Sequence, residues 1–294
     1  MHEAAEPADA PVFLVRALAA LVAATSGLIV LGALVRANDA GLACPDWPLC
    51  FGEFVPRMDL RVGFEYAHRV FAGSVGLCFA ALAVAVLRRP PLRRRCATSL
   101  AVAAVLLAAQ VILGALTVWQ LLAAWTVTAH LLTGNAFAAT LLWTLLSLRG
   151  GGGSARGVSG TTRGVLAVTS ALLLLQMLLG GLVASRYAGL ACTEWPACNA
   201  GIWFPSFEGA VGIHLLHRWN AVLLVGALAA LCGAARDTAG LGRIAGLALA
   251  LGLVQVGVGV ANVLMQLPVE VTGLHAGLAT VLVLTLTAAV HRSR

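Results

Sequence analysis

The chain of 294 residues contains no lysine, so all 19 of its basic side chains are arginines. Charged residues make up only 11% of it, whereas soluble domains carry about a quarter. Hydrophobic residues account for 60%, and the mean hydropathy is +0.94. This shortage of charge excludes an ordinary soluble domain and predicts an integral membrane protein.

Alternating apolar segments, which mark the strands of a membrane β-barrel, are missing from the long hydrophobic runs, such as the run from Ala171 to Val183. A transmembrane helix instead needs roughly 20 consecutive apolar residues. The sequence therefore predicts an all-α integral membrane protein. Eight stretches meet the requirement: about 12–35, 63–87, 97–119, 122–148, 164–186, 210–234, 241–264 and 269–291.

A basic patch of the kind that binds nucleic acid is also absent, because most arginines lie in loops on one predicted face. The opposite loops hold only Arg36, Arg57, Arg61 and Arg186. The positive-inside rule therefore predicts that both termini are cytoplasmic. The first residues, MHEAAEPADAP, are acidic and match neither a signal peptide nor a transit peptide, which favours a bacterial plasma membrane.

The chain repeats itself once. The segment GLACPDWPLC from Gly41 recurs at a shift of 148 residues as GLACTEWPAC from Gly189. Four spans in each half return the chain to its starting side, so the repeats are parallel rather than inverted. We expect two parallel-repeat four-helix bundles. Further residues recur at a shift of 145: Gln110 with Gln255, Gly114 with Gly259, and His130 with His275.

The predicted division follows this repeat. A cytoplasmic tail over 1–11 precedes the N-terminal bundle over 12–148, and the C-terminal bundle covers 164–291 before a short tail over 292–294. The bundles are joined by residues 149–163, whose Gly/Ser-rich sequence RGGGGSARGVSGTTR is typical of a flexible linker.

Four histidines lie inside predicted spans: His68, His130, His217 and His275. Ionisable groups at membrane depth are expensive and usually functional, although a lone histidine can simply bond a neighbouring backbone. Each half here carries a pair, on its second and fourth spans. Facing histidines inside a four-helix bundle are a way to hold b-type haem, so the two bundles offer two haem sites.

Arg69 and Arg218 directly follow the second-span histidine in their halves. Each is a candidate for a bidentate contact with a haem propionate. The alternative is an arginine that extends to the membrane interface.

Glu65 precedes His68 by one helical turn, and its counterpart in the second half is His214. A carboxylate there can act as acid or base during oxidation, or stabilise a cationic intermediate. It can also be an acid favoured by the helix macrodipole. A di-iron site is excluded, because it requires a second Glu-x-x-His motif and two further glutamates.

Two predicted outer loops each carry a C-x5-C pair, Cys44 with Cys50 and Cys192 with Cys198. This spacing fits neither a zinc ribbon nor a C-x-x-C redox motif. Disulfides persist in an oxidising compartment, so a disulfide in each loop is favoured. A reactive cysteine that passes through a thiol state is the alternative.

These features together resemble the heme A synthase family, in its type with a cysteine pair in both loops. The resemblance rests on GLACPDWPLC followed by EYAHR, the four paired histidines and the repeated halves, and it covers nearly all of the chain after the first ten residues. Phe51 and the Gly-rich linker are modest departures. The family oxidises the C8 methyl of haem O by successive hydroxylations to a gem-diol, which loses water to give the formyl group of haem A.

The resemblance implies that His217 and His275 hold a haem b cofactor, and that substrate haem O lies between His68 and His130, with Glu65 required for its oxidation. The implied partners are a protohaem farnesyltransferase, terminal-oxidase assembly factors and membrane lipid, with no nucleic acid. A di-haem b-type electron carrier explains the histidines equally well, but not Glu65 or the doubled cysteine loops. A transporter is disfavoured because the intramembrane polar groups are histidines in ligand-like pairs.

Overall fold

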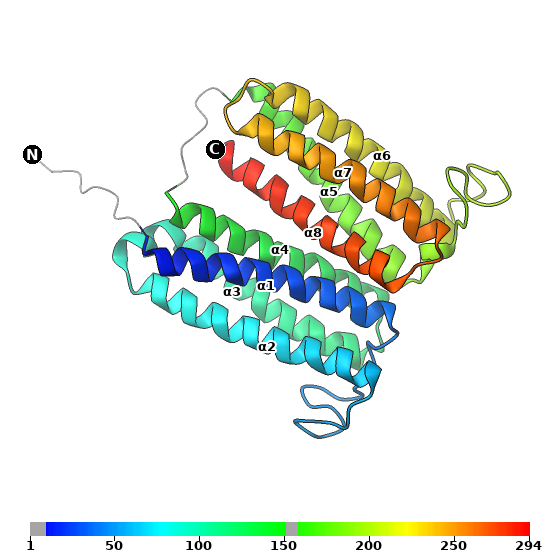
Figure 1. The fold of residues 1–294 in the computed structure, drawn as a ribbon, viewed down its shortest axis with the longest axis horizontal. Coiled ribbons are helices and arrows are strands. Elements are labelled where there is room, and N and C mark those ends of the chain that lie inside the picture. The colour runs from blue at the N-terminus through cyan, green and yellow to red at the C-terminus, as the bar shows by residue number, and fades with distance from the viewer. Residues whose placement is uncertain (1–9, 151–157) are drawn as a thin grey trace, which may run out of the picture.

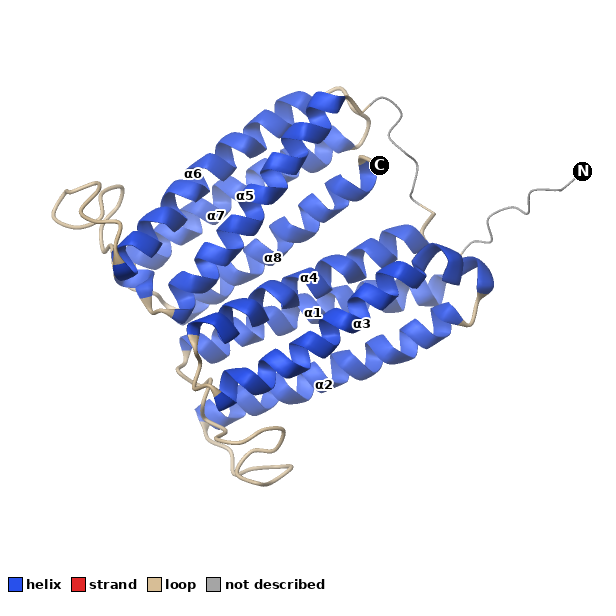
Figure 2. Ribbon diagram, turned by 180° about the vertical axis from the view of Figure 1, so that it is seen from behind, coloured by secondary structure: helices blue, strands red, loops and turns tan. Residues whose placement is uncertain are grey.

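The structure, a computed structural model, describes residues 10–150 and 158–294. Within this part of the chain, eight long helices lie side by side (Figures 1 and 2), and all eight are long and apolar enough to cross a membrane. The predicted all-α, multi-pass architecture is confirmed. The helices are α1 (Val12–Ala37), α2 (Leu60–Leu87), α3 (Pro90–Trp119), α4 (Ala124–Leu148), α5 (Gly160–Ser185), α6 (Gly209–Ala235), α7 (Leu241–Leu264) and α8 (Val269–Arg292), with a short 3-10 helix η1 (Ala188–Leu190) between α5 and α6.

One predicted boundary is wrong. Helix α3 begins at Pro90 rather than near residue 97, because proline, which lacks a backbone N–H, fits the first turn of a helix. The two prolines therefore open the helix instead of interrupting the chain. As a result, Arg93, Arg94 and Arg95 lie within the first turns of α3 and not in the preceding loop.

Helices α1 to α4 gather on one side of Figure 1 and helices α5 to α8 on the other. The two groups meet where α8 contacts α1 and α4, and where α4 contacts α5. The parallel-repeat arrangement and the limits of its two domains stay predictions. Most of the proposed tail over 1–11 and residues 151–157 of the proposed linker over 149–163 fall outside the described residues, and the last four residues of that linker lie in α5.

The apolar core lies toward one end of the helices. In the first half it joins the start of α1 to the end of α4, with Leu14 and Leu148 both 1% exposed. In the second half it joins the end of α6 to the start of α7, with Leu231 and Leu241 fully buried. The four candidate histidines lie toward the other end, near the loops that carry the cysteines. Packing of apolar side chains therefore stabilises one end of the helices, and the candidate polar site lies at the other end.

Two extended loops project from that second end (Figure 1). One joins α1 to α2 and the other joins α5 to α6. The start of α1 and the end of α8 lie at the opposite end, as expected for an even number of spans.

Candidate functional site

The first loop is closed by a disulfide between Cys44 and Cys50. Its tip is a two-residue turn at Phe51 and Gly52, which both have positive φ, as hairpin turns of this length favour. The Asp46 carboxylate accepts the N–H groups of both turn residues at 2.7 Å. The bond from Gly52 is the main cause that holds the pKa of Asp46 below its usual value, so the carboxylate that fixes the tip is ionised at neutral pH.

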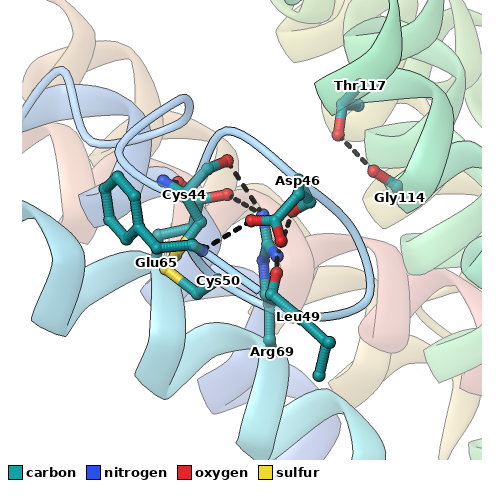
Figure 3. Close-up of polar contacts among 9 residues, drawn as sticks. Cys44, Asp46, Leu49, Cys50, Glu65, Arg69, Gly114 and Thr117 are labelled. Atoms are coloured by element: carbon teal, nitrogen blue, oxygen red, sulfur yellow. Dashed lines mark hydrogen bonds and ion pairs between the residues drawn. A yellow bond between two sulfur atoms is a disulfide. The ribbon is translucent and has the colours of Figure 1, made fainter. Parts of the chain in front are cut away.

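Arg69 of α2 extends into the loop from below (Figure 3). Its guanidinium donates to the backbone carbonyl oxygens of Asp46 at 2.7 Å, Leu49 at 2.5 Å and Cys44 at 3.3 Å. It also pairs with the Glu65 carboxylate one turn earlier, at 2.5 Å. The arginine therefore ties the loop to the start of α2.

Glu65 completes this tie. It is 5% exposed, and its second carboxylate oxygen accepts the backbone N–H of Cys44 at 2.8 Å. Both oxygens of the carboxylate are thus engaged, one by the loop and one by Arg69. Since Glu65 lies three residues before His68, the structure brings a charge-paired carboxylate within one turn of a candidate haem ligand.

The second loop is built in the same way. A disulfide joins Cys192 to Cys198, and the Glu194 carboxylate accepts the N–H groups at the loop tip at 3.1 and 3.0 Å. Arg218 donates to the carbonyl oxygens of Cys192 at 2.8 Å and Glu194 at 2.9 Å. Both predicted disulfides are therefore present in the structure. Each loop also has a cis proline after its tryptophan, at Pro48 and Pro196.

His214 stands in the second half where Glu65 stands in the first. Its Nδ1 lies 3.3 Å from the backbone nitrogen of Cys192, and its Nε2 lies 3.1 Å from Nε of Arg218. A neutral imidazole accepts a hydrogen bond at one of its two nitrogens, so one of these two contacts is a hydrogen bond and the other is a polar contact. The chemical difference predicted between the halves is real, but it occurs at a position that anchors the loop in both. Contact of Arg69 or Arg218 with a haem propionate stays a prediction.

Each of the four histidines lies against a glycine of the helix adjacent in sequence. A Cβ on the glycine would meet Cε1 of the histidine ring at 3.1 to 3.6 Å, which at the lower end is tighter than side chains normally pack. At Gly32, Gly180 and Gly259 an added Cβ would require the ring to shift by a few tenths of an ångström, whereas at Gly114 it would make an ordinary contact. The pairs are Gly32 with His68, Gly114 with His130, Gly180 with His217, and Gly259 with His275.

The histidines of the fourth spans share a further contact. Gln110 of α3 donates to the backbone carbonyl oxygen of His130 at 2.9 Å, and Gln255 of α7 donates to that of His275 at the same distance. These amides fix the helix backbone at the histidine and leave the ring free.

The residues fit haem by their donor chemistry. Nδ1 of His68, His130 and His275 is buried and has no hydrogen-bond partner among the described residues, and buried polar atoms normally have one. Imidazole is a common axial ligand of haem iron, and the glycines make room for each ring between two helices. No cluster of three or more His, Cys, Asp or Glu side chains in the described ranges could hold a bare metal ion. Two pairs of imidazoles instead suit haem, because the porphyrin supplies the four equatorial nitrogen ligands of the iron.

Several parts of this arrangement escaped the sequence analysis. The carboxylate clamps at Asp46 and Glu194 are one example, and the glycines at positions 32 and 180 are another. Both pairs are related by the shift of 148 residues that relates the cysteine loops. A complete comparison of the two halves could have found them, because matched polar and small residues stand out in a chain this apolar.

Comparison with known proteins points to one family. A family model described as cytochrome oxidase assembly protein, COX15-CtaA, matches residues 16–63 and 60–287, which is most of the chain.

Three curated relatives that resemble the chain over two thirds or more of its length are heme A synthases. The chain is 31% identical to the heme A synthase of Shewanella oneidensis over 301 residues, covering 88% of this chain and 90% of that one. It is also 31% identical to the heme A synthase of Symbiobacterium thermophilum over 281 residues, covering 90% and 92%. A third heme A synthase, from Halalkalibacterium halodurans, is 29% identical over 203 residues, covering 67% and 68%.

Proposed function

Because this chain belongs to the cytochrome oxidase assembly protein family, whose curated members that resemble it are heme A synthases, we propose that it is a heme A synthase. Its substrate is haem O, and the reaction converts the C8 methyl to a formyl group. Two successive hydroxylations, each a two-electron oxidation that consumes an external oxidant, give a gem-diol, which loses water. The single observation that carries the proposal is the set of four glycine-backed histidines beneath two disulfide loops.

The two halves have different roles in this proposal. His217 and His275 hold haem b, which supplies an iron centre able to exchange electrons with the substrate side. His68 and His130 receive haem O. Nδ1 has no hydrogen-bond partner among the described residues in both His68 and His130, whereas in the cofactor pair His217 has a ring contact with Gln176. This difference supports a substrate site that exchanges its occupant.

Glu65 is the proposed catalytic residue. Its carboxylate is fixed by Cys44 and Arg69 and lies on the helix that carries His68. From this place it can hold a proton or balance positive charge that develops on the substrate methyl. The charge of the carboxylate is the property that His214 does not reproduce in the second half.

The protein acts in a bacterial plasma membrane, with both termini cytoplasmic and the disulfide loops outside. The arginine-rich ends of the helices support this orientation. Haem O enters from the lipid or from a protohaem farnesyltransferase, and haem A passes to terminal-oxidase assembly factors.

Pigment analysis tests the proposal. The chain is produced beside a farnesyltransferase that makes haem O, and the haems are extracted and separated. We expect haem A from the wild type. Glu65→Gln keeps the size of the side chain and should give accumulated haem O with haem b still bound. Undiminished haem A in this variant would exclude the catalytic role of Glu65.

A di-haem electron carrier is the second candidate. It is favoured by the matched contacts of Glu65 and His214, which give both halves the same loop anchor. The same experiment separates the two functions, because a carrier binds haem and leaves haem O unchanged.

A further inference from the structure

One of the four histidines is held by a side chain of another helix. The amide nitrogen of Gln176, on α5, lies 3.2 Å from Nδ1 and 3.3 Å from Nε2 of His217. The same nitrogen donates to the His217 carbonyl oxygen at 3.2 Å. Gln176 therefore contacts both the ring and the backbone of this histidine, which fixes the ring relative to α5.

Gln176 is held in turn by Asn220 of α6, which is 5% exposed. The Asn220 amide donates to Oε1 of Gln176 at 2.7 Å and to the Leu172 carbonyl oxygen at 3.0 Å. Asn220, Gln176 and His217 thus form a continuous chain of polar contacts across α5 and α6. A network of this kind restrains each of its members.

The first half has apolar side chains at the matching positions. Leu28 stands at a shift of 148 from Gln176, and Phe71 stands at a shift of 149 from Asn220. Both pack against the hydrophobic cluster of the first half. Nδ1 of His68, the histidine on this side, is buried and has no hydrogen-bond partner in the part of the chain that the structure describes. In the first half, therefore, His68 is positioned by packing and not by a side-chain hydrogen bond to its ring.

The fourth-span histidines do not share this difference. Gln110 and Gln255 make the same contact with the carbonyl oxygens of His130 and His275. The two halves thus treat one ligand of each pair alike and the other differently.

We propose that Gln176 and Asn220 are positioning residues that hold His217 as a permanent ligand of the haem cofactor. Leu28 and Phe71 leave His68 able to take up and release the substrate haem. This inference rests on the proposed function, since it assigns the cofactor to the second half. It adds a second chemical difference between the halves, independent of Glu65.

The physical basis is the orientation of a metal ligand by its neighbour. A histidine that binds a metal usually has its other ring nitrogen hydrogen-bonded, and loss of that partner commonly costs about 10- to 100-fold in affinity. Asn220 holds Oε1 of Gln176, so the amide nitrogen of Gln176 is the atom that faces the ring and can donate to a ring nitrogen without a proton. Leu28 has no polar atom to offer to His68.

The test compares haem retention by the purified full-length protein. Gln176→Met keeps an unbranched side chain of similar length and removes the amide. We expect it to lose haem b to a soluble haem scavenger about 10- to 100-fold more readily than the wild type. Leu175→Met, on the exposed neighbouring position of the same helix, is the matched control and should retain haem b.

Two further variants give readouts that a purely structural role would not move. Gln176→Glu places an anionic acceptor beside the ring, so the midpoint potential of haem b should fall while haem is retained. Leu28→Gln supplies the first half with the missing amide, so more haem O should remain bound after purification. Asn220→Leu should weaken haem b retention in the same direction as Gln176→Met.

An unshifted potential in Gln176→Glu, together with haem retention within twofold of wild type in Asn220→Leu, would overturn the inference even if Gln176→Met failed to fold. Haem A formation by the wild type tests the proposed function separately. A chain that makes no haem A but loses haem b on Gln176→Met would refute the synthase activity and retain the role of Gln176.

Discussion

Glu65 and His214 face the same two groups: the backbone N–H of a loop cysteine, and the guanidinium of an arginine four residues further along the helix. A carboxylate and an imidazole therefore serve as equivalent anchors for two disulfide loops. The difference that remains between them is charge. Exchange of the two side chains, in Glu65→His and His214→Glu, can therefore separate the anchoring of the loops from the proposed catalytic role of Glu65.

Glu65→Ala should destabilise the first loop more than Glu65→His. Alanine leaves the partly buried Arg69 guanidinium without its carboxylate, and removal of one partner from a pair of this kind costs up to about 3 kcal/mol. Histidine preserves an acceptor, as position 214 shows. Thermal unfolding and protease cleavage between Cys44 and Leu60 would measure the difference. Haem A formation should be lost in both variants.

His214→Glu is the reciprocal control and should leave the second loop protected and haem b bound. If Glu65→His exposed the loop as much as Glu65→Ala, the two positions would not be interchangeable anchors.

Gly259→Val should expel haem b from the second half. A Cβ at this position would lie 3.2 Å from Cε1 of His275, and the added methyl groups of valine would displace the ring. Gly257→Val on the same helix is the control, because a Cβ there meets nothing within 4 Å. Haem content per chain, from the absorption spectrum of the purified protein, checks the result. Equal haem content in the two variants would exclude steric control by Gly259.

Thiol labelling should distinguish three cysteines from the other four. The described structure leaves Cys78, Cys96 and Cys232 as free thiols and joins the remaining four in two loops. We expect a maleimide reagent to add at most three labels to the denatured, unreduced chain and seven after reduction. Mass spectrometry would count them. More than three labels before reduction would show that a loop disulfide is open.

The tip of the first loop should loosen in acid. The N–H groups of Gly52 and Phe51 hold the pKa of Asp46 below its usual value, so the ionised carboxylate stabilises the folded loop. That stabilisation is present at pH values above the carboxyl's unfolded pKa and is lost as the pH falls through the lowered one. Trp47, whose ring lies 6.0 Å from that of Trp119, can report this change by fluorescence.

Asp46→Asn should remove the acid transition of the Trp47 signal, obtained by subtracting the spectrum of Trp47→Phe. A transition of the same size and midpoint in Asp46→Asn would assign it to another group.

The spans were predictable from sequence because membrane crossing depends on run length and polarity. Seven of the eight helices begin within four residues of the prediction. The start of α3 was missed because Pro90 and three arginines suggest a loop, whereas both are tolerated in the first turns of a helix whose side chains reach the interface.

The histidines and cysteines were also visible, because such residues are rare in an apolar chain. The sequence did not predict which groups these side chains contact. Arg69 and Arg218 were expected to meet haem propionates, yet their guanidinium groups also bind loop carbonyl oxygens, and backbone acceptors leave no trace in residue type. Gln176 carries no motif either, and its role depends on which side chain of α6 faces it.

The glycine contacts bear on how the protein is assembled in the membrane. Every one of the four lies within a pair of consecutive helices: α1 with α2, α3 with α4, α5 with α6, and α7 with α8. A nascent chain that enters the bilayer two helices at a time would complete each histidine seat before the next pair emerges from the ribosome. Contacts this close in sequence form quickly. Each haem would then need only to join two helical hairpins that have already formed.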